Sequence, residues 1–322
     1  MKSIRNNKIA VIGGDPRLLS AAEALGSAGY TLTLYGFDPK PHLVERPAVD
    51  SGCCSDGWRP PSDFEAAIGR AGKLCKSPEE AIAGCGAVIL PLPASTDGVH
   101  ITMPLAPKDS LTPADLVRMM RDAGVCVLFG GKLGSALTAL CRNVGITACD
   151  YYEREEFAVA NAVPTAEGAI AIAMEELPIT LHGATALVIG GGRIGKVLAD
   201  RLAGLCAAVT VTARKASDLM WTRVRGLTDA RTGALAELLS GRKFDVIFNT
   251  VPQLVLGERE LSRIPIGTPI IDLASKPGGV DFHAAKGMGH RVIWALSLPG
   301  KVAPVTSGRI IADTVISCLA EG

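Results

Sequence analysis

A glycine-rich turn near the middle of the chain constrains the fold more than any other feature. The apolar run from Ala184 to Ile189 predicts a buried strand, and the following residues read G-x-G-x-x-G, with Gly190, Gly192 and Gly195 as the glycines. An apolar periodicity typical of a helix begins directly afterwards. Strand, tight turn and helix form the context in which this spacing indicates a dinucleotide site. A tight turn without a ligand is the alternative.

Each position in the turn has a distinct physical role. Gly190 permits the sharp bend, Gly192 lets the backbone approach a pyrophosphate, and Gly195 allows the helix to pack closely on the strand. The backbone amides at the helix N-terminus, which include those of Arg193 and Ile194, carry a partial positive charge that favours phosphate.

The residues after the second strand of this half bear on the choice of cofactor. The run from Ala208 to Ala213 predicts that strand, and Arg214 stands where an NAD site usually has an acidic residue. Together with Lys215 and Ser217, Arg214 suits the 2′-phosphate of NADP. The alternatives are a solvated arginine at the strand end and NAD as the cofactor.

Two later strands predict further cofactor contacts at their carboxyl ends. After the strand Phe244–Phe248, we expect the next loop to lie over the cofactor, with contacts from Asn249, Thr250, Val251 and Pro252. After the strand Pro269–Leu273, Ala274 is expected near the nicotinamide end.

The first half of the chain repeats the β-α rhythm but lacks the full glycine pattern. A strand from Lys8 to Ile12 precedes Gly13-Gly14-Asp15, and a helix follows. We interpret this turn as part of a Rossmann-like domain without a second dinucleotide. The alternative is that Asp15 and Arg17 rim the cleft.

Candidate substrate contacts are predicted at strand and helix ends, where ligands bind in open α/β sheets. Ser95 and Thr96 follow a buried strand, and Thr165 is expected to N-cap the helix 169–177. Thr306 and Ser307 begin the last helix, and Lys276 offers a cation. These six are the substrate-binding candidates.

The spacing of residues identifies no clear group for acid–base catalysis. His100 and Asp97 are weak candidates.

The composition limits the number of domains, the kinds of binding partner and the cellular location that we expect. The 322 residues suit two domains, and a net charge of +1 gives no electrostatic case for nucleic acid or an anionic membrane. No apolar run reaches membrane-spanning length and no signal peptide is evident, so a cytoplasmic location is expected. The nine cysteines contain no C-x-x-C pair, which favours free thiols and no metal site. A homo-oligomer is left open.

The pattern predicts an α/β fold with two Rossmann-like, doubly wound parallel-sheet domains and a cleft between them. Residues 1–150 form the substrate-side domain, and residues 151–305 form the NAD(P)-binding domain. A C-terminal helix over about 306–322 packs back on the first domain.

Several longer motifs carry a family resemblance. They read KIAVIGGDPR (8–17), EREEFAVANAVPTAEG (153–168), GGGRIG (190–195), NTVP (249–252), DLASKPGGVDF (272–282) and ALSLPGKVAPVTSG (295–308). Jointly and in this order they resemble the A subunit of dipicolinate synthase across nearly the whole chain. The stretch 48–61 departs from that pattern and is interpreted as an insertion.

The resemblance implies a specific chemistry. The family makes dipicolinate, the calcium-chelating acid of bacterial endospores, so the implied reaction is NADP-dependent dehydration and oxidation of 4-hydroxy-tetrahydrodipicolinate, on a branch of the lysine pathway. It also implies a partner, the flavoprotein-like B subunit of dipicolinate synthase, as well as a small dicarboxylate substrate and a sporulating mother cell as the location. Two alternatives stay open: another NADP-dependent two-domain dehydrogenase of an amino or hydroxy acid, and a non-catalytic nucleotide-binding subunit.

Overall fold

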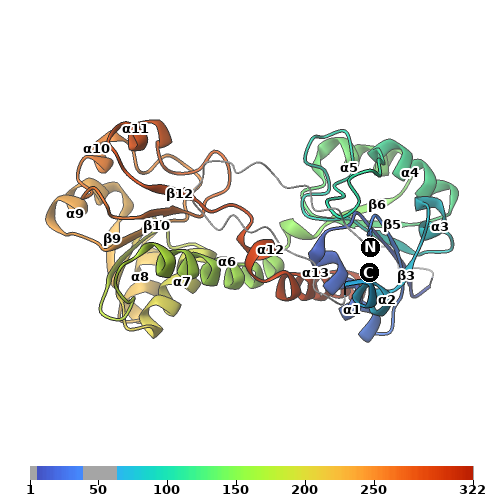
Figure 1. Cartoon of the computed structure of the whole chain (residues 1–322), viewed down its shortest axis with the longest axis horizontal. Helices are drawn as coiled ribbons and strands as arrows, with labels where there is room; N and C mark the ends of the chain where they lie inside the picture. The colour runs from blue at the N-terminus through green and yellow to red at the C-terminus, as the bar shows by residue number, and fades with distance from the viewer. Residues whose placement is uncertain (1–5, 39–63, 322) are drawn as a thin grey trace. The chain divides into compact units, whose positions relative to one another are not determined.

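The computed structural model of the chain describes residues 6–38 and 64–321. These residues form two compact units (Figure 1). Unit 1 contains residues 6–38, 64–160 and 303–321, and unit 2 contains residues 161–302. The stretch 48–61, interpreted above as an insertion, lies outside the described residues.

Unit 1 is built on a six-stranded parallel sheet with the order β3-β2-β1-β4-β5-β6. Its strands are β1 (Lys8–Ile12), β2 (Thr31–Tyr35), β3 (Lys73–Leu74), β4 (Ala87–Ile89), β5 (Val127–Gly130) and β6 (Thr147–Asp150). Its helices are α1 (Pro16–Ser27), α2 (Phe64–Ala71), α3 (Pro78–Ile82), α4 (Pro113–Asp122), α5 (Gly134–Asn143), the 3₁₀ turn η1 (Tyr151–Glu153) and α13 (Pro304–Ala320).

Unit 2 repeats the same topology, with a second six-stranded parallel sheet in the order β12-β11-β10-β7-β8-β9. Its strands are β7 (Thr185–Ile189), β8 (Ala208–Ala213), β9 (Thr228–Arg231), β10 (Val246–Asn249), β11 (Ile270–Asp272) and β12 (Val292–Trp294). Its helices are α7 (Arg193–Gly204), α8 (Ala216–Val224), η2 (Thr232–Ala234), α9 (Leu235–Gly241), α10 (Glu258–Leu261), α11 (Phe282–Gly287) and α12 (Leu298–Val302). The predicted fold class, two doubly wound Rossmann-like sheets, is confirmed.

Alternating side chains of the strands supply a core on each face of each sheet. In β1, Ile9 and Val11 pack with α1, α2 and α13, whereas Ala10 and Ile12 face the layer containing α4 and α5. In β7, Val188 packs toward α7 and Ile189 toward α9 and α11. Both sheets are therefore buried on both sides, as their nearly continuous apolar strands require.

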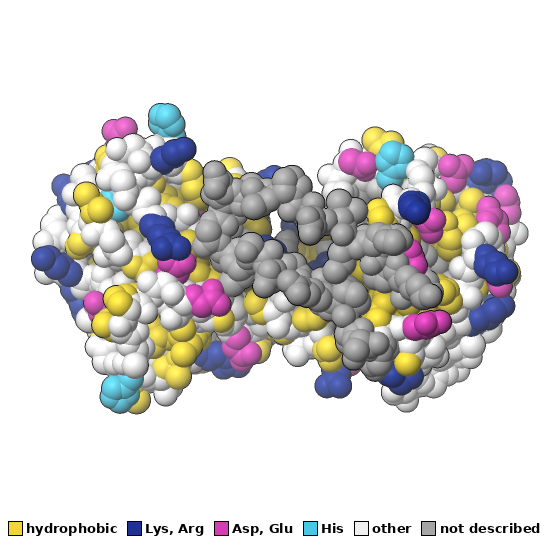
Figure 2. Space-filling model, in the orientation of Figure 1, with side chains coloured by type: hydrophobic (Ala, Val, Ile, Leu, Met, Phe, Trp, Pro, Cys, Tyr) yellow, Lys and Arg dark blue, Asp and Glu magenta, His cyan; other side chains and the backbone are white. Residues whose placement is uncertain are grey.

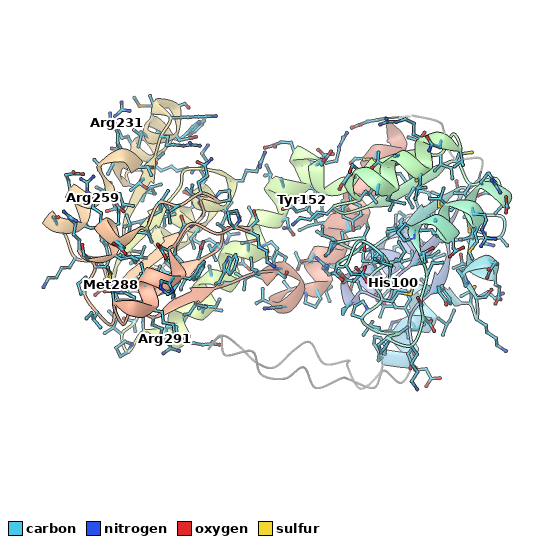
Figure 3. All side chains as sticks on the ribbon, turned by 90° about the horizontal axis from the view of Figure 1, so that it is seen from above. His100, Tyr152, Arg231, Arg259, Met288 and Arg291 are labelled. Carbon is cyan, nitrogen blue, oxygen red and sulfur yellow. The ribbon has the colours of Figure 1, made fainter. Side chains whose placement is uncertain are left out.

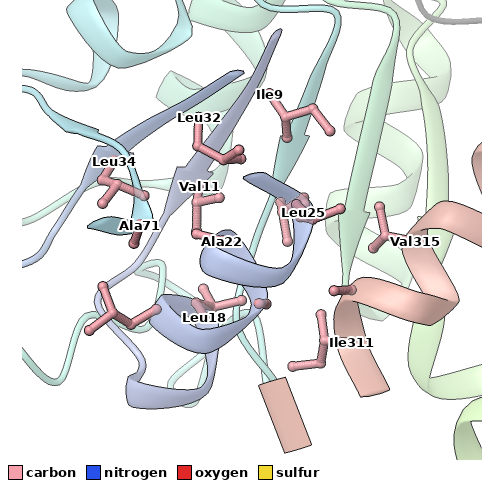
Figure 4. Packing of buried hydrophobic residues seen from close by; sticks show 14 of the residues in the cluster. Ile9, Val11, Leu18, Ala22, Leu25, Leu32, Leu34, Ala71, Ile311 and Val315 are labelled. Atoms are coloured by element: carbon pink, nitrogen blue, oxygen red, sulfur yellow. The ribbon is translucent and has the colours of Figure 1, made fainter. Parts of the chain in front are cut away.

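The C-terminal helix α13 completes the core of unit 1 by lying against α1. Ile311 and Val315 of α13 face the cluster that includes Leu18 and Leu25 (Figure 4). At Gly308 the two helices come into backbone contact, because a Cβ there would lie 2.2 Å from the carbonyl oxygen of Arg17. Gly308 thus fixes the first turn of α13 beside the start of α1.

Helix α6 (Glu155–Glu176) corrects one predicted element. Thr165 was expected to cap a helix starting near residue 169, but the helix begins ten residues before Thr165 and runs through Pro164. Thr165 lies in the interior, and its Oγ1 donates to the carbonyl of Asn161 at 2.8 Å. Burial of the small apolar face of α6 in the unit 2 core outweighs the hydrogen bond lost at Pro164.

Candidate functional site

The glycine-rich turn of unit 2 lies between β7 and α7, next to β10, where the strand order reverses. Gly190 has φ +109°, and a Cβ on it would lie 2.3 Å from the Thr250 hydroxyl oxygen. A Cβ on Gly195 would lie 1.9 Å from the carbonyl oxygen of Gly190. Both positions therefore require glycine for packing within the chain.

Gly192 differs from its two neighbours in the motif. A Cβ on it would meet nothing within 4 Å, although Gly192 is the N-cap of α7 and no described side chain caps that helix. Ile194 is half-buried in the first turn of α7, while Arg193 is exposed. The helix thus presents an open backbone surface with a partial positive charge, which suits a pyrophosphate.

The three residues predicted to select NADP lie together where β8 meets α8. Arg214, Lys215 and Ser217 are all exposed, and Lys215 is the N-cap residue of α8. The Arg214 guanidinium reaches Gln253 Oε1 at 3.4 Å, a long contact that leaves it accessible. In the same region Asp218 is paired with Lys196 at 3.0 Å, so its carboxylate is neutralised beside the glycine turn.

A buried amide–carboxylate pair fixes the two loops next to that turn. Asp272 and Asn249 have no exposed surface, and Asn249 Nδ2 donates to Asp272 Oδ1 at 2.8 Å. Asp272 also accepts the backbone N–H groups of Ala274 and Gly279, while Asn249 exchanges hydrogen bonds with the backbone of Val251. The Asn249 side chain is therefore already hydrogen-bonded within the protein, and the Thr250 hydroxyl donates to the Ile189 carbonyl at 3.0 Å. A contact from this loop to a ligand would come mainly from backbone groups.

The remaining candidates of unit 2 line the same carboxyl edge. Ala274 is buried, and its carbonyl accepts the indole N–H of Trp294 at 2.9 Å. Pro252 and Lys276 are exposed on their loops. These loops follow β10 and β11, so the candidates lie at the strand ends where the sequence predicts the ribose and nicotinamide.

The corresponding turn of unit 1 is filled by the chain itself. Around Gly13 a Cβ would meet the Thr102 carbonyl at 2.7 Å, and at Gly14 it would meet the Gly36 carbonyl at 1.8 Å. The Asp15 carboxylate caps α1 by accepting the N–H of Arg17 at 2.9 Å. Backbone atoms and a carboxylate thus occupy the space that a pyrophosphate would need.

Arg17 is held in a nearly buried ion pair at the same edge. Its Nε and Nη2 bond the Asp15 carboxylate, and Nη2 also donates to the Leu92 carbonyl. Only 14% of the Arg17 side chain and 9% of the Asp15 side chain are exposed. Burial lowers the pKa of Arg17, but the Asp15 carboxylate outweighs this and raises it overall, so the guanidinium stays charged.

The loop after β4 brings three predicted residues together around one carboxylate. Asp97 accepts the Ser95 hydroxyl at 3.1 Å and the backbone N–H groups of Val99 and His100, each at 2.8 Å. His100 Nδ1 lies 2.9 Å from Asp97 Oδ2. Thr96 is exposed in the same turn.

These hydrogen bonds assign different roles to Asp97 and His100. The His100 backbone N–H, followed by its imidazole and the Val99 N–H, holds the pKa of Asp97 well below its usual range. Because Asp97 is an acceptor only, Nδ1 of His100 must carry the proton that it donates, and Nε2 is left to accept one. His100 is exposed on unit 1 (Figure 3). The pair therefore has the geometry of an oriented general base.

Thr306 and Ser307 lie in the first turn of α13, beside the start of α1. Thr306 is exposed, whereas Ser307 is 2% exposed and donates its backbone N–H to Ala303. The structure therefore brings these residues near Arg17 within unit 1. Thr165 lies in unit 2, with its hydroxyl bonded inside α6.

Two residues at these edges were not among the predicted site residues. Asp272 organises the loops beside the glycine turn, but only its burial between two strands reveals this. Lys132 follows β5 in a left-handed conformation, with φ +52°, which is uncommon for a residue other than glycine. Its amide donates to Asp150 at 3.1 Å.

Comparisons with known proteins identify the family. Residues 65–152 match the model of the N-terminal domain of the dipicolinate synthase A subunit. The chain is 31% identical over 314 residues to the A subunit of dipicolinate synthase from Bacillus subtilis (strain 168), covering 98% of this chain and 96% of that protein. The chain belongs to the family of dipicolinate synthase A subunits.

Solved structures agree with this assignment. The A subunit of dipicolinate synthase from Bacillus halodurans superposes with a TM-score of 0.80 at 29% identity, covering 98% of each chain. An L-alanine dehydrogenase shares the fold with a TM-score of 0.61 at 14% identity, over 98% of this chain and 89% of that one. The family resemblance inferred from the motifs is confirmed, and the fold is one that dehydrogenases use.

On the face shown in Figure 2, the Lys and Arg side chains of the described residues are interspersed with Asp and Glu, and they form no separate basic or acidic patch. Within residues 6–38 and 64–321, α6 is the one helix whose length and apolar composition would allow it to cross a membrane. Of its most apolar window, 56% is buried in the protein, as is usual for a core helix.

Proposed function

We propose that the chain is an NADP-dependent dehydrogenase that converts 4-hydroxy-tetrahydrodipicolinate to dipicolinate. Loss of water from the substrate gives a dihydropyridine diacid. Its oxidation gives dipicolinate as a hydride leaves to NADP⁺ and a proton leaves to a base, so that NADPH and H⁺ are the coproducts. Formation of the aromatic ring supplies driving force. Family membership supports the substrate, and the glycine turn supports the cofactor.

The observation that carries the proposal is the open N-terminus of α7. Gly192 leaves a backbone surface on which a phosphate can rest, while Gly190 and Gly195 are packed against the protein. NADP would supply the hydride acceptor when bound. The chain would hold its pyrophosphate with the amides of residues 192–194, and its 2′-phosphate with Arg214, Lys215 and Ser217. Thr250, Val251, Pro252 and Ala274 would line the ribose and nicotinamide positions, and NAD remains the alternative cofactor.

On unit 1, His100 is proposed as the group that accepts the proton, positioned by Asp97. The Asp97 carboxylate orients the imidazole through Nδ1, which makes Nε2 the basic atom. Ser95, Thr96, Thr306, Ser307 and Lys276 are proposed to contact the substrate carboxylates. Thr165 and Ser95 are the least suited, because each hydroxyl already donates to an acceptor within the protein.

The proposed setting is the cytoplasm of the sporulating mother cell, and the proposed partner is the flavoprotein-like B subunit. The single test is to supply the purified chain, alone and together with that partner, with NADP⁺ and the hydroxylated precursor. Production of NADPH and of pyridine absorbance by the chain alone supports the proposal. If neither signal develops until the B subunit is present, a non-catalytic nucleotide-binding role is favoured.

A variant pair tests the proton acceptor. His100→Gln should lower kcat by roughly 100-fold, because general-base catalysis typically contributes 10²–10⁴-fold. His182→Gln, which changes an exposed histidine of unit 2, is the matched control and should leave kcat unchanged. Equal kcat in both variants would remove His100 from the mechanism.

A further inference from the structure

Lys132 has an unusual backbone conformation at the edge of the sheet where unit 1 would meet a ligand. It follows β5 with φ +52°, in the left-handed region of backbone conformation. Glycine adopts this conformation at a lower energetic cost than lysine. Two glycines, Gly131 and Gly134, stand close by in the sequence, yet this position holds a long cationic side chain. Strained backbone of this kind is concentrated at functional sites, because packing must hold it in place.

The carboxylate of Asp150 holds Lys132 in this conformation. Asp150 Oδ1 accepts the N–H of Lys132 at 3.1 Å and that of Tyr152 at 2.9 Å, while Oδ2 accepts the N–H of Leu133 at 2.9 Å. Three backbone amides of two different loops therefore converge on one side chain. The ends of β5 and β6 are tied together, and the direction of the Cα–Cβ bond of Lys132 is fixed.

The Lys132 ammonium is exposed on the surface of unit 1. Its Nζ lies 4.8 Å from the centre of the Tyr152 ring, and it forms no ion pair with a carboxylate in the described part of the chain. Other basic groups at this edge do have acidic partners, since Arg17 is paired with Asp15 and His100 is hydrogen-bonded to Asp97. The Lys132 ammonium is thus not neutralised by a direct ion pair with a described carboxylate, so an anionic ligand could pair with it.

Backbone hydrogen bonds connect Lys132 to the rest of this edge through the loop after β4. The Gly131 N–H donates to the Pro91 carbonyl at 3.1 Å, and the Gly131 carbonyl accepts from Ala94 at 2.8 Å. On the other side of the same loop, Leu92 accepts from Arg17. Lys132 and Arg17 therefore flank one loop, the one that continues to Ser95, Asp97 and His100.

Arg17 is suited to donate a directed hydrogen bond to a ligand, whereas its positive charge is already compensated by Asp15. Asp15 and Leu92 use its Nε and Nη2, whereas Nη1 takes part in no hydrogen bond with the described residues. Since β4 lies between β1 and β5, the two strand ends are roughly 10 Å apart. A six-membered ring with two carboxylates, held by one hydrogen bond of about 3 Å at each end, spans a distance of that order.

We propose that Lys132 and Arg17 bind the two carboxylates of a small ring dicarboxylate, and that Lys132 sets the preference for a dicarboxylate over a monocarboxylate. This inference rests on the proposed function for its substrate class. It assigns the recognition of the second carboxylate to a residue that no sequence motif singles out.

The test is calorimetric binding of pyridine-2,6-dicarboxylate and of pyridine-2-carboxylate to the full chain, with no turnover required. Wild type should prefer the dicarboxylate. Lys132→Met should weaken dicarboxylate binding by roughly tenfold or more and leave monocarboxylate binding nearly unchanged. Lys132→Arg should retain most of the preference, because the cation is kept.

Two control variants distinguish the loss of the Lys132 charge from an effect on folding. Arg142→Met removes one exposed cation from the last turn of α5, far from the strand ends that carry the site, and should leave both affinities unchanged. Lys132→Gly removes the cation and relieves the left-handed backbone, so it should lose the preference with no fall in Tm.

The outcomes are distinguishable from those of the enzyme assay. If Lys132→Met keeps the wild-type preference, or if wild type shows none, the inference is overturned even where the chain produces NADPH. If the preference depends on Lys132 in a chain that does not turn over alone, the inference is supported and the catalytic proposal fails separately.

Discussion

The first β-α turns of the two units share a topology but differ in what lies at the helix N-terminus. In unit 1, Asp15 caps α1 with its own carboxylate, and backbone atoms of residues 36 and 102 fill the space around the glycines. In unit 2, Gly192 caps α7 without a side chain, and a Cβ placed on it would meet no described atom within 4 Å. A glycine-rich turn after a first strand is therefore no evidence of a phosphate site by itself; the residue at the N-cap decides whether an anion can enter.

The difference has an electrostatic consequence as well. The partial positive charge at the N-terminus of α1 is compensated by the Asp15 carboxylate, and the charge of Asp15 is compensated in turn by Arg17. The charge of α7 has no such partner among the described side chains. One unit thus uses its turn to stabilise the fold, and the other keeps its turn available for binding. Three changes test this contrast, and a fourth compares one cysteine from each unit.

The largest effect is expected from Asp15→Ala in unit 1. It removes the cap of α1 and leaves the guanidinium of Arg17 buried without its carboxylate, so the free energy of unfolding should fall by about 3 kcal/mol. Urea denaturation measures this. Asp281→Ala removes the N-cap of α11, which accepts from Ala284 without an arginine partner, and should cost only about 1 kcal/mol.

The two variants therefore separate capping from the ion pair. Equal losses would show that Arg17 contributes nothing beyond the cap. The double variant Asp15→Ala/Arg17→Met should recover part of the loss, since no unpaired charge is then left buried at this position.

The next largest effect is expected from Gly192→Ala in unit 2. The new Cβ meets nothing in the described chain, and φ −77° is ordinary for alanine, so Tm should not change. The methyl group would crowd a bound pyrophosphate, and we expect the Kd for NADP to rise by roughly 30-fold, or about 2 kcal/mol. Titration of intrinsic fluorescence measures it.

Gly204→Ala is the matched control for that change. Gly204 ends α7, and a Cβ there also meets nothing within 4 Å. NADP binding should be unaffected, and stability should rise slightly because alanine favours the helix. A normal Kd in Gly192→Ala would mean that the turn of unit 2 holds no pyrophosphate, as in unit 1.

A smaller effect is expected from Arg214→Asp, which asks whether unit 2 is specialised for NADP. The Kd for NADP should rise by roughly tenfold, whereas the Kd for NAD should stay the same or fall. Lys243→Asp makes a similar charge change before β10, at the opposite end of the sheet, and should alter neither constant. Parallel changes for both nucleotides would remove the 2′-phosphate assignment.

The sequence predicted those features that depend on local pattern. Buried strands such as β7 and β1 are continuous apolar runs, and the glycine spacing of the β7–α7 turn is visible without a structure. The short edge strands β3 and β9 were missed, because Lys73–Leu74 and Thr228–Arg231 lack an apolar pattern and are defined by pairing alone.

Features that depend on tertiary context were beyond the sequence. The helix predicted over 169–177 with Thr165 as its cap begins earlier, because packing in the core of unit 2 carries α6 through Pro164. The Asp272–Asn249 pair, the left-handed Lys132 and the pairing of Asp97 with His100 become visible only when the loops are folded on their strands. The glycine turn could be predicted, but not the residues that would choose a substrate.

The smallest effect concerns two cysteines, one in each unit, that differ in burial. Cys141 of α5 is fully buried, and burial raises the pKa of its thiol to about 11, whereas Cys206 after α7 is exposed. A thiol in the unfolded chain ionises near pH 8.5. Above that pH, ionisation lowers the free energy of the unfolded chain, whereas the buried Cys141 thiol of the folded protein stays protonated. Its contribution to stability is complete below about pH 8.5 and is lost between there and the folded pKa.

Between pH 7 and pH 9, wild type should therefore lose about 1 kcal/mol of stability that Cys141→Ala does not lose. Comparing urea denaturation at both pH values cancels the cost of the small cavity, which is present in the variant at each pH. Cys206→Ala should show the same alkaline loss as wild type, because it leaves the buried Cys141 thiol in place. If Cys141→Ala retains the full loss, the alkaline sensitivity arises elsewhere, and burial of the Cys141 thiol does not account for it.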